Sequence, residues 1–353
     1  MDFSATQPLQ PPPQPVRFHG TGGDYFRIWI VNLALTIVTL GIYGAWAKVR
    51  RLQYMYRNTE LDGSSFEYWG QPLTILKGRI VALVLLLLYK FGFRVSTLFG
   101  VAVLVLLAAV LPVLLRNSMR FRLHNSSYRG LRFSFHGSVG QAYVTFLFGY
   151  LLTIVTLGLA APYFHWKLKR YQHGEARFGQ AAFSFAPRAG AFYAIYVQAW
   201  LLLIAAIAGI AIFISVTLGG SGGLKALAKA PPPALATAAF MFVVITLFLL
   251  YSAFFNARLQ NLIWNGTRLG EHRFEYRLSV WPLFVIYFGN WLFTLLTLGF
   301  YYPWAMVRLM RYKAECMTLV PAGSLDDFVA SQEQEVGAAG EETADLFDID
   351  ISF

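Results

Sequence analysis

The chain has little charge and almost no cysteine. Of its 353 residues 13% are charged, about half the share of soluble domains, and 57% are hydrophobic. A single cysteine, Cys316, excludes an intrachain disulfide and a metal site built from several cysteines. Low charge combined with high hydrophobic content indicates an integral membrane protein.

Catalytic signatures are also missing. The sequence contains no GxxxxGK[ST], HExxH, CxxC or GxSxG pattern, and its six histidines lie apart from carboxylates at metal-ligand spacing. No acidic residue lies inside an apolar run, which argues against a proton relay of buried carboxylates. We therefore expect no enzyme activity, no catalytic residues, no cofactor and no metal site.

Long uncharged runs dominate the remainder. Six of them can each supply the roughly 20 apolar residues of a membrane-spanning helix, namely 28–47, 95–115, 133–164, 192–218, 230–257 and 279–307. A shorter run, 80–89, can span if the flanking Lys77, Arg79, Lys90 and Arg94 extend to the interfaces. These runs predict several membrane crossings.

One pattern occurs three times. Residues 35–41 read L-T-I-V-T-L-G, residues 152–158 repeat those seven letters, and residues 293–299 read F-T-L-L-T-L-G. Such repetition indicates one supersecondary unit used three times. We place the copies at about 17–58, 135–172 and 276–313, with helix breaks at Gly41, Gly158 and Gly299. Two helix pairs, about 71–124 and 186–264, separate the copies, and the second pair contains a Gly/Pro/Ala-rich loop at 219–233.

The joints between these units share a second pattern. Turn residues precede two aromatic residues with one residue between them, as in Phe66-x-Tyr68, Phe133-x-Phe135, Phe183-x-Phe185 and Phe274-x-Tyr276. Alternation with period two, preceded by Asn and Gly, predicts four small β-hairpins or extended turns packed on one another. The alternative is that these aromatics form an interfacial belt at helix starts.

Basic clusters flank every unit, which leaves two topologies open. If all clusters lie on the cytoplasmic side, each T-L-G unit must enter and leave on that side as a re-entrant element. About 16 residues precede each break, a length short for a full crossing. Otherwise each unit spans once, which gives seven crossings and violates part of the positive-inside pattern. We favour the re-entrant topology, with both termini cytoplasmic.

Polar residues recur at matching positions of the copies, at helical spacings of three and four. They are Asn32, Thr36 and Thr39, then Thr153 and Thr156, then Asn290, Thr294 and Thr297. This stripe lines a solute path, or it supplies hydrogen bonds between helices and back to helix carbonyls. The sequence leaves both interpretations open.

Aromatic and cationic residues follow each break. They include Trp46, Lys48 and Arg50, then Lys167, then Trp304 and Arg308. Helices of this composition lie in the headgroup region, where the cations bind anionic lipids or where the side chains serve as simple interfacial anchors.

With these motifs in view, the chain resembles the bacterial YjgN-like inner-membrane family, a domain family of unknown function. The matching text is F-H-G-x-G-G-D-Y-F-R-I-W-I-V-N at 18–32, T-L-G-I-Y-G-A-W-A-K-V-R at 39–50, N-T-x-L-D-G-x-x-F-x-Y at 58–68 and I-L-K-G-R at 75–79. The resemblance implies a multi-pass protein of the bacterial cytoplasmic membrane and brings no catalytic residues. The second copy departs from the pattern, with His165 at the Lys48 position and Gly149 at the Asn32 position.

The fold class expected from these features is an all-α polytopic membrane protein with three pseudo-repeats and hairpin-like joints. It comprises a disordered, proline-rich tail at 1–16, a membrane domain at 17–320 and an acidic tail at 321–353, which carries nine of the 18 acidic residues. The acidic tail folds back on the basic face of the body, binds an unidentified protein partner or stays solvated.

Two functions fit this chain. The first is transport or channel activity for a small solute, because Gly-interrupted apolar repeats are a recurring device in transporters. The second is a membrane scaffold that binds anionic lipids and carries an acidic regulatory tail. Membrane lipids are the expected partners, a small solute is a candidate partner for the first function, and nucleic acid is not expected.

Overall fold

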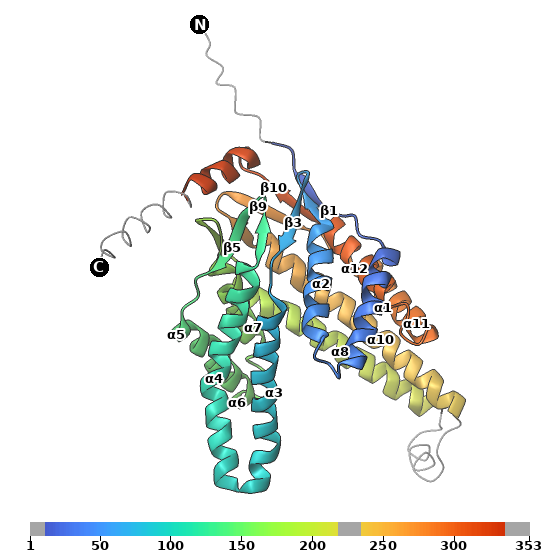
Figure 1. The fold of residues 1–353 in the computed structure, drawn as a ribbon. Helices are drawn as coiled ribbons and strands as arrows, with labels where there is room; N and C mark the ends of the chain where they lie inside the picture. Colours follow the sequence, from blue (N-terminus) through green and yellow to red (C-terminus); the bar gives the residue numbers. More distant parts are fainter. Residues whose placement is uncertain (1–10, 218–233, 336–353) are drawn as a thin grey trace.

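The protein is organised around a closed antiparallel β-barrel. The computed structural model describes residues 11–217 and 234–335. Ten short strands close the barrel: β1 (Gln14–Phe18), β2 (Thr59–Leu61), β3 (Ser64–Tyr68), β4 (Ser126–Tyr128), β5 (Leu131–Phe135), β6 (Ala176–Phe178), β7 (Ala181–Phe185), β8 (Thr267–Leu269), β9 (His272–Tyr276) and β10 (Met317–Val320). The all-α fold class predicted from the sequence is therefore wrong, because every joint contributes strands to one sheet. Figure 1 shows the barrel at one end of the molecule and the long helices extending from it.

The four predicted β-hairpins are confirmed at the four joints. They are β2–β3, β4–β5, β6–β7 and β8–β9, each with a two-residue turn. Asp62-Gly63 and Arg129-Gly130 both have positive φ at the two turn positions, as tight hairpins require. In the other two hairpins Gly179 and Gly270 occupy the first turn position, with φ of 57° and 54°. This shift explains why those two joints have one more residue between glycine and the aromatic pair.

The two aromatic residues of a joint pack against different parts of the molecule. Residues two apart on a strand share a face, so the second aromatic lies one step closer to the helices. Phe133 packs in the barrel core with Phe178, whereas Phe135 packs below it with Ala142 and Tyr171. Phe274 and Tyr276 divide in the same way between the barrel and the α10–α11 region. Alternation with period two therefore encodes both the barrel and its attachment to the helices.

Five helical hairpins connect successive strand pairs. The helices are α1 (Gly22–Val38), α2 (Gly44–Arg57), α3 (Pro72–Val95), α4 (Thr97–His124), α5 (Val139–Ala142), a π-helical turn η1 (Tyr143–Phe148), α6 (Gly149–Val155), α7 (Ala161–Gly174), α8 (Ala189–Thr217), α10 (Ala234–Asn265), α11 (Val280–Leu296) and α12 (Tyr302–Glu315). The strands before and after each helical hairpin pair with each other, as Phe18 with Thr59 and Phe135 with Ala176. Each hairpin therefore leaves and rejoins the barrel at the same rim.

This attachment selects between the two topologies. A T-L-G unit that starts and ends at paired strands enters and leaves on one side, as the re-entrant alternative requires. The unit also proves to be one of five equivalents rather than one of three. Five backbone hydrogen bonds make the equivalence explicit, each from the residue after a strand to the end of a helical hairpin: His19 to Asn58 (2.9 Å), Trp69 to Asn125 (2.8 Å), His136 to Glu175 (2.8 Å), Ala186 to Gly266 (2.8 Å) and Arg277 to Cys316 (3.0 Å).

Four of the described helices, α3, α4, α8 and α10, are long and apolar enough to cross a membrane. The helices of the T-L-G units are shorter; α11, for example, has 17 residues. Neighbouring hairpins contact each other through α2–α3, α4–α5, α7–α8, α10–α11 and α12–α1, so the hairpins form a closed ring beneath the barrel. The loop predicted at 219–233 lies outside the described residues.

The T-L-G sequence builds the break inside each re-entrant hairpin. Leu40 and Gly41 take φ of 49° and 93°, and the Gly41 amide donates to the Thr36 carbonyl over 2.8 Å. This pattern is a Schellman-type helix end. The Thr39 hydroxyl donates to the Leu35 carbonyl (2.7 Å) and accepts from the amide of Tyr43 (3.0 Å) at the start of α2. The same bonds recur around Gly158 and Gly299, so a helix ends at the T-L-G sequence of each copy.

The domain boundaries move outward relative to the sequence-based division. Strand β1 begins at Gln14, inside the stretch expected as a tail, and a helix at 325–335 docks on the barrel from within the acidic segment. The remainder of both predicted tails, 1–10 and 336–353, lies outside the described residues.

We predict that Gly41→Ala lowers the free energy of unfolding by about 1–2 kcal/mol, because its φ of 93° is strained for any residue with a Cβ atom. Thermal unfolding in detergent measures the change. Gly140→Ala is the matched control, since Gly140 lies in α5, has no positive φ and leaves open space for a Cβ atom. Equal behaviour of the two variants would contradict the role given to the break.

Candidate functional site

A cavity lined by three cations lies between the first and third T-L-G units and the first spanning helix. It has a volume of about 560 Å³ and is lined by residues of α1, α2, α3, α11 and α12. Its cations are Lys48, Arg51 and Arg79, and its aromatic residues are Tyr25, Trp29 and Tyr302. None of its lining residues is acidic. The cavity thus gathers three positive charges from two different hairpins.

These three cations have no counter-ion of their own. The four ion pairs of the described residues involve other groups, and no hydrogen bond joins Lys48, Arg51 or Arg79 to a protein acceptor in the described part of the chain. Partial burial, followed by the charges of Arg79, Arg51 and Arg122, lowers the pKa of Lys48 below its usual range. An anion in the cavity would relieve this repulsion.

The side chain of Arg79 reaches the cavity because Gly44 has no side chain to block it. A Cβ atom at Gly44 would lie 2.6 Å from Nη1 of Arg79, so the guanidinium packs directly over the glycine at the start of α2. The contact brings a cation of α3 beside Lys48 and Arg51 of α2. Any larger side chain at Gly44 would displace it.

Asn32 lines the same cavity and is 6% exposed, and its Oδ1 has no hydrogen-bond partner. Its counterpart Asn290 donates from Nδ2 to the Ala305 carbonyl (3.0 Å), yet its Oδ1 is also unpaired. Asn290 lines a neighbouring cavity of about 540 Å³, which shares Thr294, Gly299 and Tyr302 with the first. Asn32 and Asn290 therefore line adjoining cavities, and the side-chain oxygen of each is buried without a hydrogen-bond donor.

The threonines of the predicted stripe serve mainly the helices. Five of the six donate to carbonyls four residues earlier: Thr36 to Asn32 (2.6 Å), Thr39 to Leu35 (2.7 Å), Thr153 to Gly149 (2.9 Å), Thr156 to Leu152 (2.8 Å) and Thr297 to Phe293 (2.7 Å). Thr36 and Thr294 also line the charged cavity. These five hydroxyls thus make the hydrogen bonds to helix carbonyls that the second interpretation of the stripe requires.

The three copies have diverged at this place. In the second copy Gly149 replaces Asn32 and the ring of Phe164 packs over it, while His165, at the Lys48 position, shares a hydrogen bond of 2.9 Å with the Tyr196 hydroxyl. In the third copy Met306 and Leu309 replace Lys48 and Arg51. The cationic set therefore belongs to the first copy.

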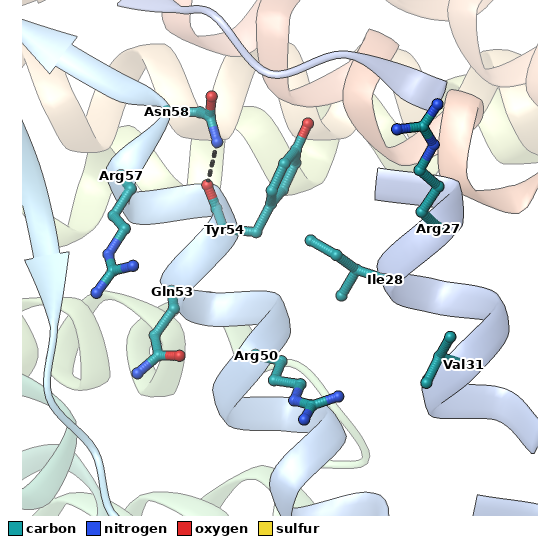
Figure 2. Close-up of a pocket in the computed structure, with 8 residues that line it drawn as sticks. All are labelled: Arg27, Ile28, Val31, Arg50, Gln53, Tyr54, Arg57 and Asn58. Carbon is teal, nitrogen blue, oxygen red and sulfur yellow. Dashed lines mark hydrogen bonds between the residues drawn. The ribbon is translucent and has the colours of Figure 1, made fainter. Parts of the chain in front are cut away.

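A second cationic groove lies on the opposite face of the α1–α2 hairpin. Figure 2 shows Arg27, Arg50 and Arg57 around this groove of about 490 Å³, with Tyr54 and Asn58 at its end. The third copy has a related groove of about 540 Å³ that includes Trp304, Arg308, Arg311 and Glu315.

The other residues predicted for lipid binding lie apart from these cavities. Trp46 stacks on Tyr43 with ring centroids 6.0 Å apart, and the Lys167 ammonium lies 5.8 Å from the ring centre of Tyr163. Sequence reasoning selected Lys48 and Arg50 but missed Arg51 and Arg79. Arg79 is the last residue of the I-L-K-G-R segment at 75–79. This family motif could have pointed to Arg79 as a site residue, whereas no local sequence pattern does.

Helical hairpins that include four candidate membrane spans and join one β-barrel indicate a multi-pass membrane protein. The chain belongs to the family described as bacterial protein of unknown function (DUF898), whose profile matches residues 13–346. It is similar to inner membrane protein YjgN of Escherichia coli K12, at 33% identity over 154 residues, which is 42% of this chain and 37% of that protein. It is also similar to inner membrane protein YjgN of Salmonella typhimurium, at 34% identity over 132 residues, 36% of this chain and 32% of that protein.

The chain thus matches about a third of the length of these curated relatives, 37% and 32%. No solved structure matches it. The family and the relatives identify a multi-pass bacterial inner-membrane protein of unknown function.

We predict that Arg79→Leu slows acylation of Lys48 by an amine-directed reagent at pH 9. Removing the neighbouring positive charge raises the lowered pKa of Lys48, so a smaller fraction of the amine is neutral and reactive. Peptide mass spectrometry after limited labelling measures the rate. Arg170→Leu is the control, because Arg170 lies over Trp166 on a different hairpin; an equal slowing in both variants would contradict the contact between Arg79 and Lys48.

Proposed function

We propose that this protein binds the phosphate-bearing headgroup of anionic phospholipids in the cavity that contains Lys48, Arg51 and Arg79. The observation that carries the proposal is the set of three cations without a protein counter-ion, gathered from α2 and α3. A phosphate group accepts charge-assisted hydrogen bonds from guanidinium and ammonium groups together. Anionic lipids supply that group at the membrane surface.

The position of the cavity supports a lipid as the source of the phosphate. The cavity lies beside the α1–α2 hairpin, whose break exposes Leu40 to 94% and which is too short to span. The corresponding leucines of the other copies, Leu157 and Leu298, are 94% and 89% exposed. Exposed leucines at the tip and cations nearer the barrel suit an element that dips into one leaflet. With the basic side cytoplasmic, the barrel and both termini lie in the cytoplasm.

Asn32 adds a preference within the anionic lipids. Its buried Oδ1 has no donor among the described protein groups, and a headgroup hydroxyl that reaches it can donate a hydrogen bond. A phosphoglycerol headgroup combines such a hydroxyl with the phosphate. Phosphatidylglycerol is therefore the ligand that satisfies both parts of the cavity.

We expect the double variant Lys48→Gln, Arg51→Gln to bind phosphatidylglycerol at least about 30-fold more weakly, since each charge-assisted hydrogen bond to the phosphate contributes about 1 kcal/mol or more. Native mass spectrometry of the protein with defined lipid mixtures measures retention. The matched control, Lys167→Gln with Arg170→Gln, makes the same charge change on α7. Similar losses in both double variants would mean that net charge, rather than the cavity, governs binding.

A competition experiment distinguishes a lipid from a free phosphate compound as the source of the bound phosphate. Soluble glycerol phosphate is added in excess over the lipid. If lipid is the ligand, retained phosphatidylglycerol is unaffected; if a free phosphate compound is the ligand, glycerol phosphate is retained and lipid is displaced.

Transport of a small polar solute is the second candidate function, favoured by the adjoining cavities with unpaired Asn32 and Asn290 oxygens. The variant Asn32→Leu with Asn290→Leu discriminates. Lipid binding predicts that it keeps anionic lipid but loses about a fivefold preference for phosphatidylglycerol over phosphatidylethanol, which has equal charge and no hydroxyl, because a net hydrogen bond contributes about 1 kcal/mol. Transport predicts that a polar metabolite retained by the wild type disappears in the variant.

A further inference from the structure

The barrel is wider than its own side chains can fill. Eight strands give an interior just large enough for the inward side chains, and this barrel has ten. The helix at 325–335 lies over the open end and inserts Leu325, Phe328 and Val329 into the core. The barrel interior is therefore completed by a segment that follows the last strand.

Specific contacts hold this cover helix, residues 325–335, in place. The Oε1 atom of Gln332 accepts from the amides of Gln180 (2.9 Å) and Ala181 (2.7 Å) at the β6–β7 turn. Arg129 binds both Asp62 of the β2–β3 turn and Asp326 of the helix. The polar contacts lie at the edge of the barrel mouth, whereas the apolar side chains point inward.

The ring of Phe328 packs against His272, with ring centroids 4.4 Å apart. The Nδ1 atom of His272 accepts from the Ala322 amide over 3.2 Å, at the turn that leads into the cover helix. Burial lowers the pKa of His272, so the neutral ring that this bond requires is the stable form.

A cavity of about 180 Å³ remains beneath the cover helix. It is lined by apolar and aromatic side chains, among them Phe66, Phe133, Phe183, Phe274 and Met317. Two polar groups at its wall have partners: the Tyr128 hydroxyl donates to the Leu61 carbonyl over 2.7 Å, and Nδ1 of His272 accepts from the Ala322 amide. An apolar cavity of about 150 Å³ in another protein stays free of water and binds benzene, so this cavity has the size and surface for a molecule of that class.

We propose that the barrel interior binds one small apolar molecule with a single aromatic ring, and that the cover helix encloses it. The volume admits one ring and does not admit the length of a fatty acyl chain. The surrounding phenylalanine rings offer faces and edges at van der Waals distance, the arrangement that aromatic ligands prefer. Neither the lipid cavity nor its cations take part, so this site is independent of the function proposed above.

Methyl groups of methionine report on the site directly. Met317 lines the cavity, whereas Met55 packs in a separate cluster with Phe18 and Tyr25. The full-length protein is labelled with [¹³C-methyl]methionine, placed in lipid nanodiscs and titrated with toluene. A bound ring shifts the Met317 methyl resonance through its ring current, and we expect a saturable shift at Met317 with Met55 unchanged.

Filling the cavity should abolish this response. Val16→Phe adds a ring from β1 into the barrel, and Val329→Phe adds one from the cover helix and replaces the first variant if that one does not fold. We expect either variant to raise the dissociation constant of the titrated ring compound at least tenfold. No shift at Met317, a linear shift shared with Met55 through partition into the bilayer, or unchanged binding in the folded filled variant would overturn the proposal.

Discussion

Pairing between the strands that precede and follow each helical hairpin is the constraint on which the rest of the structure depends. Because Phe18 pairs with Thr59 and Phe135 with Ala176, a helical segment that leaves the barrel must return to the neighbouring strand. The two long hairpins can then cross a membrane and come back, and each T-L-G unit leaves and rejoins the barrel on the same side. Backbone hydrogen bonding in a small sheet therefore holds both ends of every helical hairpin on one side of the barrel.

The T-L-G break supplies partners for backbone groups that a helix end leaves unpaired. The Thr39 hydroxyl links the two helices, because it donates to a carbonyl of α1 and accepts from the amide of Tyr43 at the start of α2. The Gly41 amide donates to the Thr36 carbonyl. Repeated threonines are thereby accounted for by the break itself. Asn32 and Asn290 are left with buried oxygens that the break does not use, which is why they mark the adjoining cavities.

Divergence among the copies places the candidate site in the first of them. Substitutions on side chains outside the break leave the turn unchanged. In the second copy Phe164 packs over Gly149, and in the third copy the uncharged Met306 stands at the position of Lys48. Arg79 completes the cationic set from a spanning helix, made possible by Gly44. The ring of hairpins thus combines one charged cavity with supporting copies of the same unit.

Membrane residence, the three breaks and the four β-hairpins were determined by the sequence itself, because apolar length, T-L-G and turn residues followed by alternating aromatics act through local geometry. Closure of the barrel was decided by tertiary structure. Strands β1 and β10 have no hairpin partner close in sequence, and Gln14 pairs with Leu319 across almost the whole chain. The same holds for Lys48 and Arg79, and for the cavity beneath Phe328. Pairs so distant in sequence are brought together by the closing of the sheet and the ring, and no local periodicity encodes them.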